Sequence, residues 1–255
     1  MLFKKWYYEA MQTLSIIIPV LNERDYLPRL LQSIVKQDYA GKYEVIIVDG
    51  GSTDETEAEA LKFLGPIPNL FFFSHQKGTS RQRNYGTTKA KYDNLIFLDG
   101  DTQLTEHSLE RISRHFASKG DFVAVPILLP YDGIIMDYVF ATLAYLYFLI
   151  VSRTNPIISG MCIITTKRIH EHIGGFNEQA KYAEDIDYGL RAFRGGYKYY
   201  ILFDTTIKSS TRRLQQMGRF KLGITWLVWY RKTAKHGVAG QQNRSDYEFG
   251  NFKKK

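Results

Sequence analysis

The chain has 255 residues, of which 44% are hydrophobic and 24% charged, as in an ordinary globular protein. This composition excludes a fibrous or disordered chain, and the length is sufficient for one large α/β domain or two small ones. The one cysteine, Cys162, excludes an internal disulfide framework and fits a reducing compartment. We expect no signal peptide, because the N-terminal residues lack an apolar core and a small-residue cleavage site.

The net charge of +8 is concentrated at the C-terminal end. Residues 1–207 contain 22 Lys and Arg against 24 Asp and Glu, a net charge of −2. Residues 208–255 contain 12 against 2, a net charge of +10. Such a basic segment can contact nucleic acid, anionic lipid or only solvent, so the residues between its charges must distinguish these partners.

The first part of the chain alternates between predicted strands and helices. Short, almost wholly apolar runs suit strands buried on both faces, and apolar stripes at helical spacing suit amphipathic helices. Repeated strand–helix units predict a mostly parallel sheet with helices on both faces, in which ligands bind beyond the carboxyl ends of the strands. The predicted strands are Leu14–Val20, Tyr43–Asp49, Leu70–Phe73 and Asn94–Leu98, and the predicted helices are Leu27–Gln37, Thr53–Leu64 and Arg81–Lys91.

The pattern changes after Gly133. Residues 138–152 are uncharged and rich in Tyr, Phe and Leu, but the stretch is shorter than the ~20 residues of a spanning helix. This length favours a buried or surface-dipping helix over a membrane span. The remaining predicted elements are a strand at Met161–Thr166, a turn at Gly174-Gly175-Phe176, a helix at Glu184–Gly195 and a strand at Tyr197–Phe203.

The sharpest local signal is Asp99-Gly100-Asp101, at the end of an apolar strand. Two carboxylates separated by one glycine can share a hard cation such as Mg²⁺ or Mn²⁺, which takes oxygen ligands and is commonly shared with substrate phosphates. The same residues can also form a plain turn, because Asp-Gly is a common turn dipeptide. A calcium loop of the EF-hand type is excluded by the spacing after Asp101.

Two further acidic motifs are ambiguous when taken alone. Asp49-Gly50-Gly51-Ser52-Thr53-Asp54 follows a strand and opens a helix, where it can approach an anionic group or act only as an N-cap. It is neither a Walker loop nor a dinucleotide fingerprint. Glu184-Asp185 can supply a general base or simply complement the dipole of the helix that it begins.

The order of the motifs resembles that of family 2 glycosyltransferases of the GT-A fold. The likeness covers about residues 13–212. The motifs that carry it are, in order, Ser15-Ile16-Ile17-Ile18-Pro19-Val20-Leu21-Asn22-Glu23, Val48–Asp54, the Gly78…Arg83-Asn84-Tyr85-Gly86 segment, Asp99-Gly100-Asp101, Gly174–Glu178 and Glu184-Asp185.

This resemblance implies an inverting transfer from a nucleoside-diphosphate sugar. It places Asp49 against the nucleotide base, with the strand end Pro19, Asn22 and Glu23 lining the same pocket. Arg81 or Arg83 would lie near the base or the diphosphate. This chain departs from the family at one place, because many members read Asp-Asp-Gly-Ser where it reads Asp49-Gly50-Gly51-Ser52. The loss of the second acidic residue leaves the nucleotide open, with uridine favoured and guanosine next.

The resemblance also implies a D-x-D motif and a catalytic base. Asp101 would be the main ligand of Mn²⁺ or Mg²⁺, with Asp99 near the ribose or the metal and Gly100 between them. Asp185 matches the base, with Glu184 beside it. The metal would neutralise charge on the departing diphosphate while the base deprotonates the incoming hydroxyl. A third metal ligand stays open among His75, His172 and His236.

The basic C-terminal segment surrounds an apolar core rich in Trp and Tyr. Basic residues flanking Trp226, Trp229 and Tyr230 suit a helix at a membrane interface, whereas a helix packed on the domain with a solvated basic face is the alternative. No nucleic-acid-binding module is visible. We therefore expect a cytoplasmic, membrane-associated protein with a peripheral membrane contact, and an acceptor that can be lipid-linked.

The expected organisation is an arm at 1–12, a GT-A domain at 13–212 and a basic, aromatic helical segment with a polar tail at 213–255. Two rival functions remain. A non-catalytic nucleotide-sugar or membrane binder on the same scaffold would not need the Glu184-Asp185 base. A sugar-phosphate nucleotidyltransferase would open with a Gly-rich, Arg-bearing phosphate loop, where this chain has Ile-Pro-Val-Leu-Asn-Glu.

Overall fold

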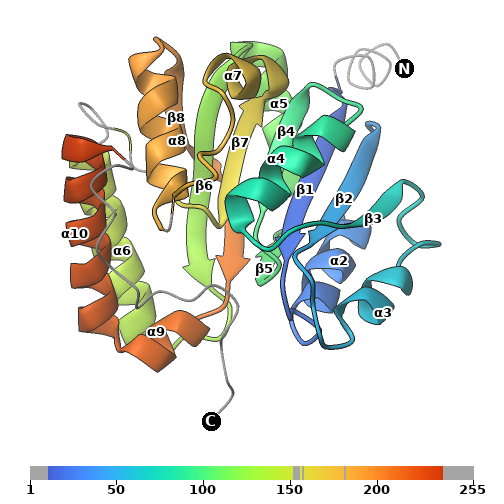
Figure 1. Cartoon of the computed structure of the whole chain (residues 1–255), viewed down its shortest axis with the longest axis horizontal. Coiled ribbons are helices and arrows are strands. Elements are labelled where there is room, and N and C mark those ends of the chain that lie inside the picture. Colours follow the sequence, from blue (N-terminus) through green and yellow to red (C-terminus); the bar gives the residue numbers. More distant parts are fainter. Residues whose placement is uncertain (1–10, 152–155, 157, 181, 238–255) are drawn as a thin grey trace.

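A computed structural model of the chain describes residues 11–151, 156, 158–180 and 182–237. Figure 1 shows a layer of strands with helices packed around it. The sheet has eight strands in the order β3-β2-β1-β4-β7-β6-β8-β5. The strands are β1 (Leu14–Val20), β2 (Tyr43–Asp49), β3 (Leu70–Ser74), β4 (Asn94–Leu98), β5 (Thr102–Leu104), β6 (Phe122–Pro130), β7 (Cys162–Thr166) and β8 (Lys198–Ser209).

The sheet is mostly parallel, as predicted. Strands β1 to β4 run parallel to their neighbours among themselves, and β6 pairs in parallel with β8. Strand β7 runs against both β4 and β6, and the short β5 runs against β8. The carboxyl ends of the parallel strands therefore share one edge, and the start of β7 lies at the same edge because Cys162 pairs with Leu98. We call this edge the carboxyl edge.

Helices cover both faces of the sheet, because the strands bury apolar side chains on both faces. In β1, Ile16 and Ile18 belong to one core cluster and Ile17 to the other. Complete burial of each such side chain stabilises the fold by about 1.5–3 kcal/mol. The helices are α2 (Leu27–Val35), α3 (Thr56–Leu61), α4 (Thr79–Lys89), α5 (Ser108–Lys119), α6 (Ile135–Val151), α7 (Lys167–His172), α8 (Glu184–Arg194), α9 (Arg212–Met217) and α10 (Arg219–His236).

A glycine sets the distance between α4 and the sheet. A Cβ atom on Gly86 would lie 2.5 Å from Cγ2 of Ile17 on β1, closer than two carbon atoms can approach. The absence of a side chain thus lets α4 pack closely on the sheet. Arg83 lies one turn earlier in this helix, so the close packing brings it into the protein interior.

Most predicted elements are confirmed, with shifts of one to three residues at their ends. The predictions missed β5, α5, β6 and α7, which lie in stretches that they left unassigned. They also ended the last strand at Phe203, which is wrong, since β8 continues to Ser209. The register between β6 and β8 shifts at Pro126/Ile127 and then resumes, so the polar residues after Phe203 interrupt the apolar pattern without ending the strand.

The C-terminal helix α10 packs on α8. Trp229 and Tyr230 are buried in a cluster with Tyr182, and the rings of Tyr182 and Trp229 stack at 4.7 Å. These two aromatic side chains therefore lie against the protein, in place of the membrane interface that the sequence suggested for them. No helix within the described ranges has both the length and the hydropathy needed to cross a membrane. Residues 1–10 of the predicted arm at 1–12, Ser152 and the whole polar tail lie outside the described residues.

Candidate active site

The carboxyl edge gathers the acidic motifs of the sequence. Glu23 follows β1, Asp49 ends β2, and Asp99 and Asp101 follow β4. The start of α8 adds Glu184 and Asp185 to the same region through contacts described below. The motifs lie together because parallel strands deliver their carboxyl ends to one edge.

Arg83 connects two of these motifs. Its guanidinium donates from Nη2 to Oδ1 of Asp99 at 2.8 Å and from Nη1 to Oε1 of Glu184 at 3.2 Å. The side chain is fully buried and also lies over the ring of Phe176. Burial alone would lower the pKa of Arg83, but the carboxylates of Asp99, Glu184 and Asp185 outweigh it and raise that pKa. Arg83 is therefore a permanent cation between the two acidic motifs.

Asp185 lies beside this ion pair, joined to it through Gly160. The carbonyl of Gly160 accepts a hydrogen bond from Arg83 at 2.7 Å, and its N–H donates to Oδ2 of Asp185 at 2.6 Å. A Cβ atom at Gly160 would meet Asp185 at 3.1 Å and Arg83 at 3.2 Å, so a glycine fits this position best. Burial, assisted by the Glu184 carboxylate, raises the pKa of Asp185 to about 7, against the opposing effects of Arg83 and two backbone N–H groups.

A second part of the edge is built from the turn after β2. The Asp49 carboxylate accepts hydrogen bonds from the N–H groups of Gly51 and Ser52 and from the Ser52 hydroxyl. Asn22, in the left-handed conformation at φ 55°, accepts from the N–H of Thr53 at 2.8 Å. Asn22 and Asp49 therefore hold the ends of β1 and β2 together and fix the shape of this turn.

Gln82 makes the same connection from α4, and the sequence analysis missed it. Its side-chain amide donates to the carbonyls of Val20 at 2.8 Å and Val48 at 2.7 Å. Gln82 is fully buried. A glutamine inside a polar helix gives no sequence signal of its own. Its role becomes visible only from the register of α4, which places both Gln82 and the neighbouring Arg83 in the interior.

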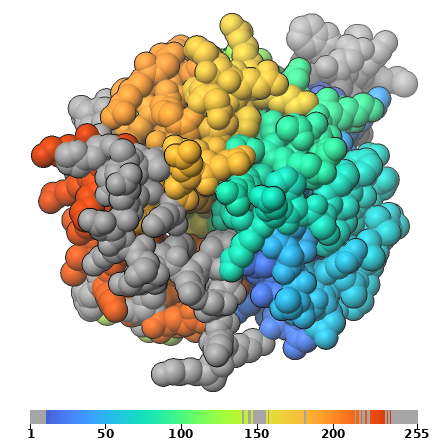
Figure 2. Space-filling model, viewed as in Figure 1, coloured from blue at the N-terminus to red at the C-terminus, as the bar shows by residue number. Residues whose placement is uncertain are grey.

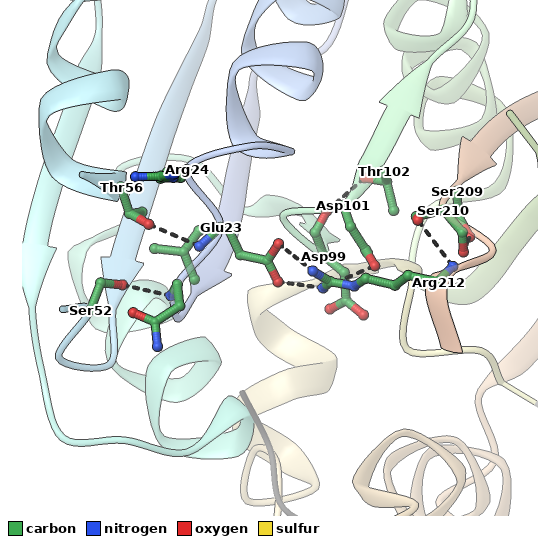
Figure 3. A network of polar contacts seen from close by, with 12 residues as sticks. Glu23, Arg24, Ser52, Thr56, Asp99, Asp101, Thr102, Ser209, Ser210 and Arg212 are labelled. Carbon is green, nitrogen blue, oxygen red and sulfur yellow. Dashed lines mark hydrogen bonds and ion pairs between the residues drawn. The ribbon is translucent and has the colours of Figure 1, made fainter. Parts of the chain in front are cut away.

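Arg212 supplies a second cation at the edge, and Figure 3 shows its guanidinium reaching between Glu23 and Asp101. It donates to both carboxylate oxygens of Glu23 and lies 3.1 Å from Oδ2 of Asp101. Burial raises the pKa of Glu23 to about 7, with Arg212 opposing the rise and Asp101 and Asp99 adding to it. Burial also raises the pKa of Asp101, again against the effect of Arg212.

The oxygen donors suit a hard divalent cation. Asp101 and Asp99 provide carboxylates two residues apart, and carboxylate oxygens are the ligands that Mg²⁺ and Mn²⁺ prefer. In the part of the chain that the structure describes, no group of three or more His, Cys, Asp or Glu side chains is arranged to hold a metal. The lack of a side chain at Gly100 lets Glu23 lie close to this turn, because a Cβ atom there would lie 3.3 Å from Cγ of Glu23.

The remaining candidates divide clearly. Arg81, on the exposed side of α4, forms a 3.8 Å ion pair with Glu178 at the surface. Of the two arginines, Arg83 is the one that contacts the two acidic motifs, through Asp99 and Glu184. His172 follows β7, whose end pairs with the start of β4, so it lies at the opposite edge of the sheet from Asp101. His75 lies at the carboxyl edge, and its ring contacts that of Tyr85 in a tilted arrangement, with the centroids 4.3 Å apart. The side chain of His236 is outside the described part.

The Gly174–Glu178 motif has a structural role. The side chain of Asn84 accepts from the N–H of Phe176 and donates to its carbonyl, each at 2.8 Å, which clamps the turn to α4. Figure 2 shows this turn, in gold, packed against α4, in teal to green. Phe176 in turn supports Arg83, so the motif stabilises the ion pair from behind.

A mostly parallel sheet with two acidic motifs joined at its carboxyl edge is the arrangement expected of a GT-A glycosyltransferase. The comparison with solved structures agrees. The mannosyltransferase PcManGT from Pyrobaculum calidifontis, in complex with GDP-Man and Mn²⁺, matches with a TM-score of 0.67 at 17% identity, over 94% of this chain and 77% of that one. Residues 15–174 match the glycosyl transferase family 2 pattern, and the chain belongs to that family.

Two curated relatives show the extent of the likeness. Glycosyltransferase AglE of Haloferax volcanii is 38% identical over 100 residues, which cover 38% of this chain and 33% of that protein. The poly(ribitol-phosphate) beta-N-acetylglucosaminyltransferase TarS of Staphylococcus aureus is 25% identical over 211 residues, which cover 80% of this chain and 36% of TarS. A TarS structure in complex with UDP-GlcNAc matches with a TM-score of 0.63 at 20% identity, over 78% of this chain and 58% of that one. The chain thus spans about a third of these curated relatives.

Proposed function

We propose that the protein is a metal-dependent, inverting glycosyltransferase. It moves a sugar from a nucleoside-diphosphate sugar to a hydroxyl or phosphate acceptor. The observation that carries this proposal is the Arg83 bridge, which joins Asp99 of the D-x-D motif to Glu184 of the base motif although 85 positions separate the two residues in the chain. A donor held at one motif would have its sugar next to the other.

The donor side is assigned from the oxygen ligands and from the relatives. Asp101, with Asp99, would hold Mn²⁺ or Mg²⁺, which when bound neutralises negative charge on the diphosphate. Glu23 and Asp49, together with Pro19, Asn22 and Gly100, would line the nucleotide pocket. A UDP-sugar is favoured because the TarS structure holds UDP-GlcNAc, and a GDP-sugar comes next because PcManGT holds GDP-Man.

The acceptor side is assigned to Asp185, with Glu184 as its neighbour. A carboxylate whose pKa is raised to about 7 is a much better proton acceptor than an ordinary aspartate, and about half of it is ionised at neutral pH. It would take the proton of the acceptor hydroxyl as the oxygen attacks the sugar carbon from the face opposite the diphosphate. One displacement of this kind inverts the configuration and needs no nucleophile from the protein.

The acceptor is proposed to be delivered at a membrane surface. Helix α6 exposes a run of apolar side chains at helical spacing, Ile135, Val139, Leu143 and Leu146, with exposed fractions of 84, 47, 60 and 53%. Residues 208–255 add a net charge of +10, which suits anionic lipid. A cytoplasmic protein in peripheral contact with the membrane could reach a lipid-linked acceptor. The aromatic residues of α10 that are buried on α8 do not contribute to this surface.

The test separates donor binding from transfer. Purified protein is titrated calorimetrically with UDP and with GDP, each with and without Mn²⁺, and hydrolysis of UDP-GlcNAc and GDP-Man is followed in the same preparations. We expect Mn²⁺-dependent binding of one nucleotide and slow hydrolysis of its sugar. Asp101→Asn should abolish the Mn²⁺-dependent part of binding, whereas Asp185→Asn should retain binding and lose turnover.

Three results would contradict separate parts of this proposal. Nucleotide binding without turnover by the wild-type protein, across hydroxyl and phosphate acceptors, would favour a non-catalytic binder on this scaffold. Turnover that is equal with and without Mn²⁺, and unchanged in Asp101→Asn, would refute the metal dependence. Hydrolysis that survives in Asp185→Asn would remove this residue from the role of base.

A further inference from the structure

Arg212 is placed like a resident counter-cation of the donor site. It is the first residue of α9, three residues after β8 ends, and its side chain is only 11% exposed. Its guanidinium makes a two-pronged ion pair with Glu23, contacts Asp101 at 3.1 Å and lies 4.6 Å from the ring centroid of Tyr26. Figure 3 shows the contacts of this side chain with Glu23 and Asp101.

The two residues before Arg212 are fixed by backbone hydrogen bonds. The N–H of Ser210 donates to the carbonyl of Asp101 at 3.1 Å, and the N–H of Thr211 donates to Asp132 at 2.8 Å. The partner Glu23 is held at its own backbone by the Thr56 hydroxyl, at 2.8 Å. Because both backbones are tied down, the long side chain of Arg212 is the part that can change position.

We propose that Arg212 occupies the cation position of the donor site in the unloaded protein, so that its contact with Asp101 and a divalent cation at Asp101 exclude each other. This inference rests on the proposed metal-dependent function. A cation bound to a carboxylate oxygen lies about 2.0–2.6 Å from it. The guanidinium, at 3.1 Å from Oδ2 of the same carboxylate, fills that space with a charge of the same sign. A cation at this oxygen would therefore require Arg212 to withdraw from it.

The arrangement explains how the empty site tolerates its acidic groups. Glu23 and Asp101 have side chains only 11 and 12% exposed, and buried carboxylates without a counter-charge are strongly unfavourable. Arg212 supplies the counter-charge when no cation is present. Once released from Asp101, its guanidinium is a donor suited to the diphosphate oxygens that arrive with the cation.

The test measures Mn²⁺ alone, without nucleotide, by the loss of the free-ion electron paramagnetic resonance signal. Arg212→Gln should bind Mn²⁺ about tenfold more tightly than the wild type, because a competing positive charge close to the ion has been removed. Arg213→Gln is the matched control, since it removes the same charge one residue further on and leaves the Arg212–Asp101 contact in place. It should tighten binding by a smaller factor.

A double variant guards against misfolding of Arg212→Gln. Glu23→Gln with Arg212→Gln removes one charge of each sign, and circular dichroism verifies its fold. It should bind Mn²⁺ more tightly than Glu23→Gln alone, which keeps the arginine. Unchanged or weaker Mn²⁺ binding on removal of Arg212 would overturn the inference.

Titration of the wild-type protein with Mn²⁺ in the presence of UDP or GDP distinguishes failure of the Arg212 exclusion from failure of the metal-dependent function. If Mn²⁺ and nucleotide bind together in the wild type but removal of Arg212 does not tighten Mn²⁺ binding, only the exclusion by Arg212 fails. If Mn²⁺ binds neither the wild type nor the variants under any of these conditions, the metal-dependent function fails as well.

Discussion

Replacement of Arg83 by methionine tests whether one buried cation holds the two acidic motifs together. Methionine has a similar length and can keep the contact with Phe176, so the change removes mainly the charge and the hydrogen bonds. It leaves Asp99 and Glu184 without their shared partner and the Gly160 carbonyl without its donor. The expected consequence is a large loss of stability.

The size of that loss follows from the burial of the groups. Breaking a fully buried ion pair costs about 3–5 kcal/mol because a charge is left unpaired in the interior. The Arg83 side chain is 1% exposed, whereas Asp99 and Glu184 are 22 and 21% exposed and can be partly solvated. The lower end, about 3 kcal/mol, is therefore expected. For a chain of this size that corresponds to a fall in Tm of roughly 6–12 °C.

Urea denaturation followed by circular dichroism measures this loss, with Arg81→Met as the matched control. Arg81 lies on the same helix and, within the described part of the chain, forms an exposed 3.8 Å ion pair with Glu178. Its replacement should change the free energy of unfolding by less than about 0.5 kcal/mol. Equal losses in the two variants, or a stable Arg83→Met protein with unchanged turnover, would refute the assignment of Arg83 as the central counter-charge.

Three further outcomes are expected. The transfer rate should rise about tenfold per pH unit below pH 7 and level off above it, because Asp185, the proposed base, has its pKa raised to about 7 and must be ionised to accept a proton. A pH–rate profile that stays flat from pH 5 to 8 would contradict this. Gly160→Ala should lower turnover with little change in calorimetric donor affinity, because the added methyl group separates Asp185 from Arg83. Leu143→Glu, on the exposed face of α6, should reduce cosedimentation with anionic vesicles about tenfold at unchanged Tm, and equal cosedimentation would remove α6 from the membrane contact.

The parallel half of the fold could be predicted from the sequence because its signals are local. Strands β1, β2 and β4 are continuous apolar runs ending in polar turns, and the predicted bounds match those of the structure. Strand β8 was harder, because a register shift interrupts its pattern and its last part is polar. That error left Arg212, the last residue of the predicted GT-A domain, without a place at the carboxyl edge. The fold class was therefore predictable, but the closure of the site by β8 and α9 was not.

The acidic and the basic halves of the site differ in how visible they are in the sequence. Asp99-Gly100-Asp101 and Glu184-Asp185 form short motifs, because each pair must act from neighbouring positions. Their counter-charges are single arginines on distant elements, and a lone arginine in a helix or after a strand is usually solvated. For Arg83, its position at the site depends on the register of α4 and on the close packing that Gly86 allows. For Arg212, it depends on where β8 ends. The acids can thus be read from local sequence, whereas the cations that compensate them become identifiable only when the sheet brings the two sets together.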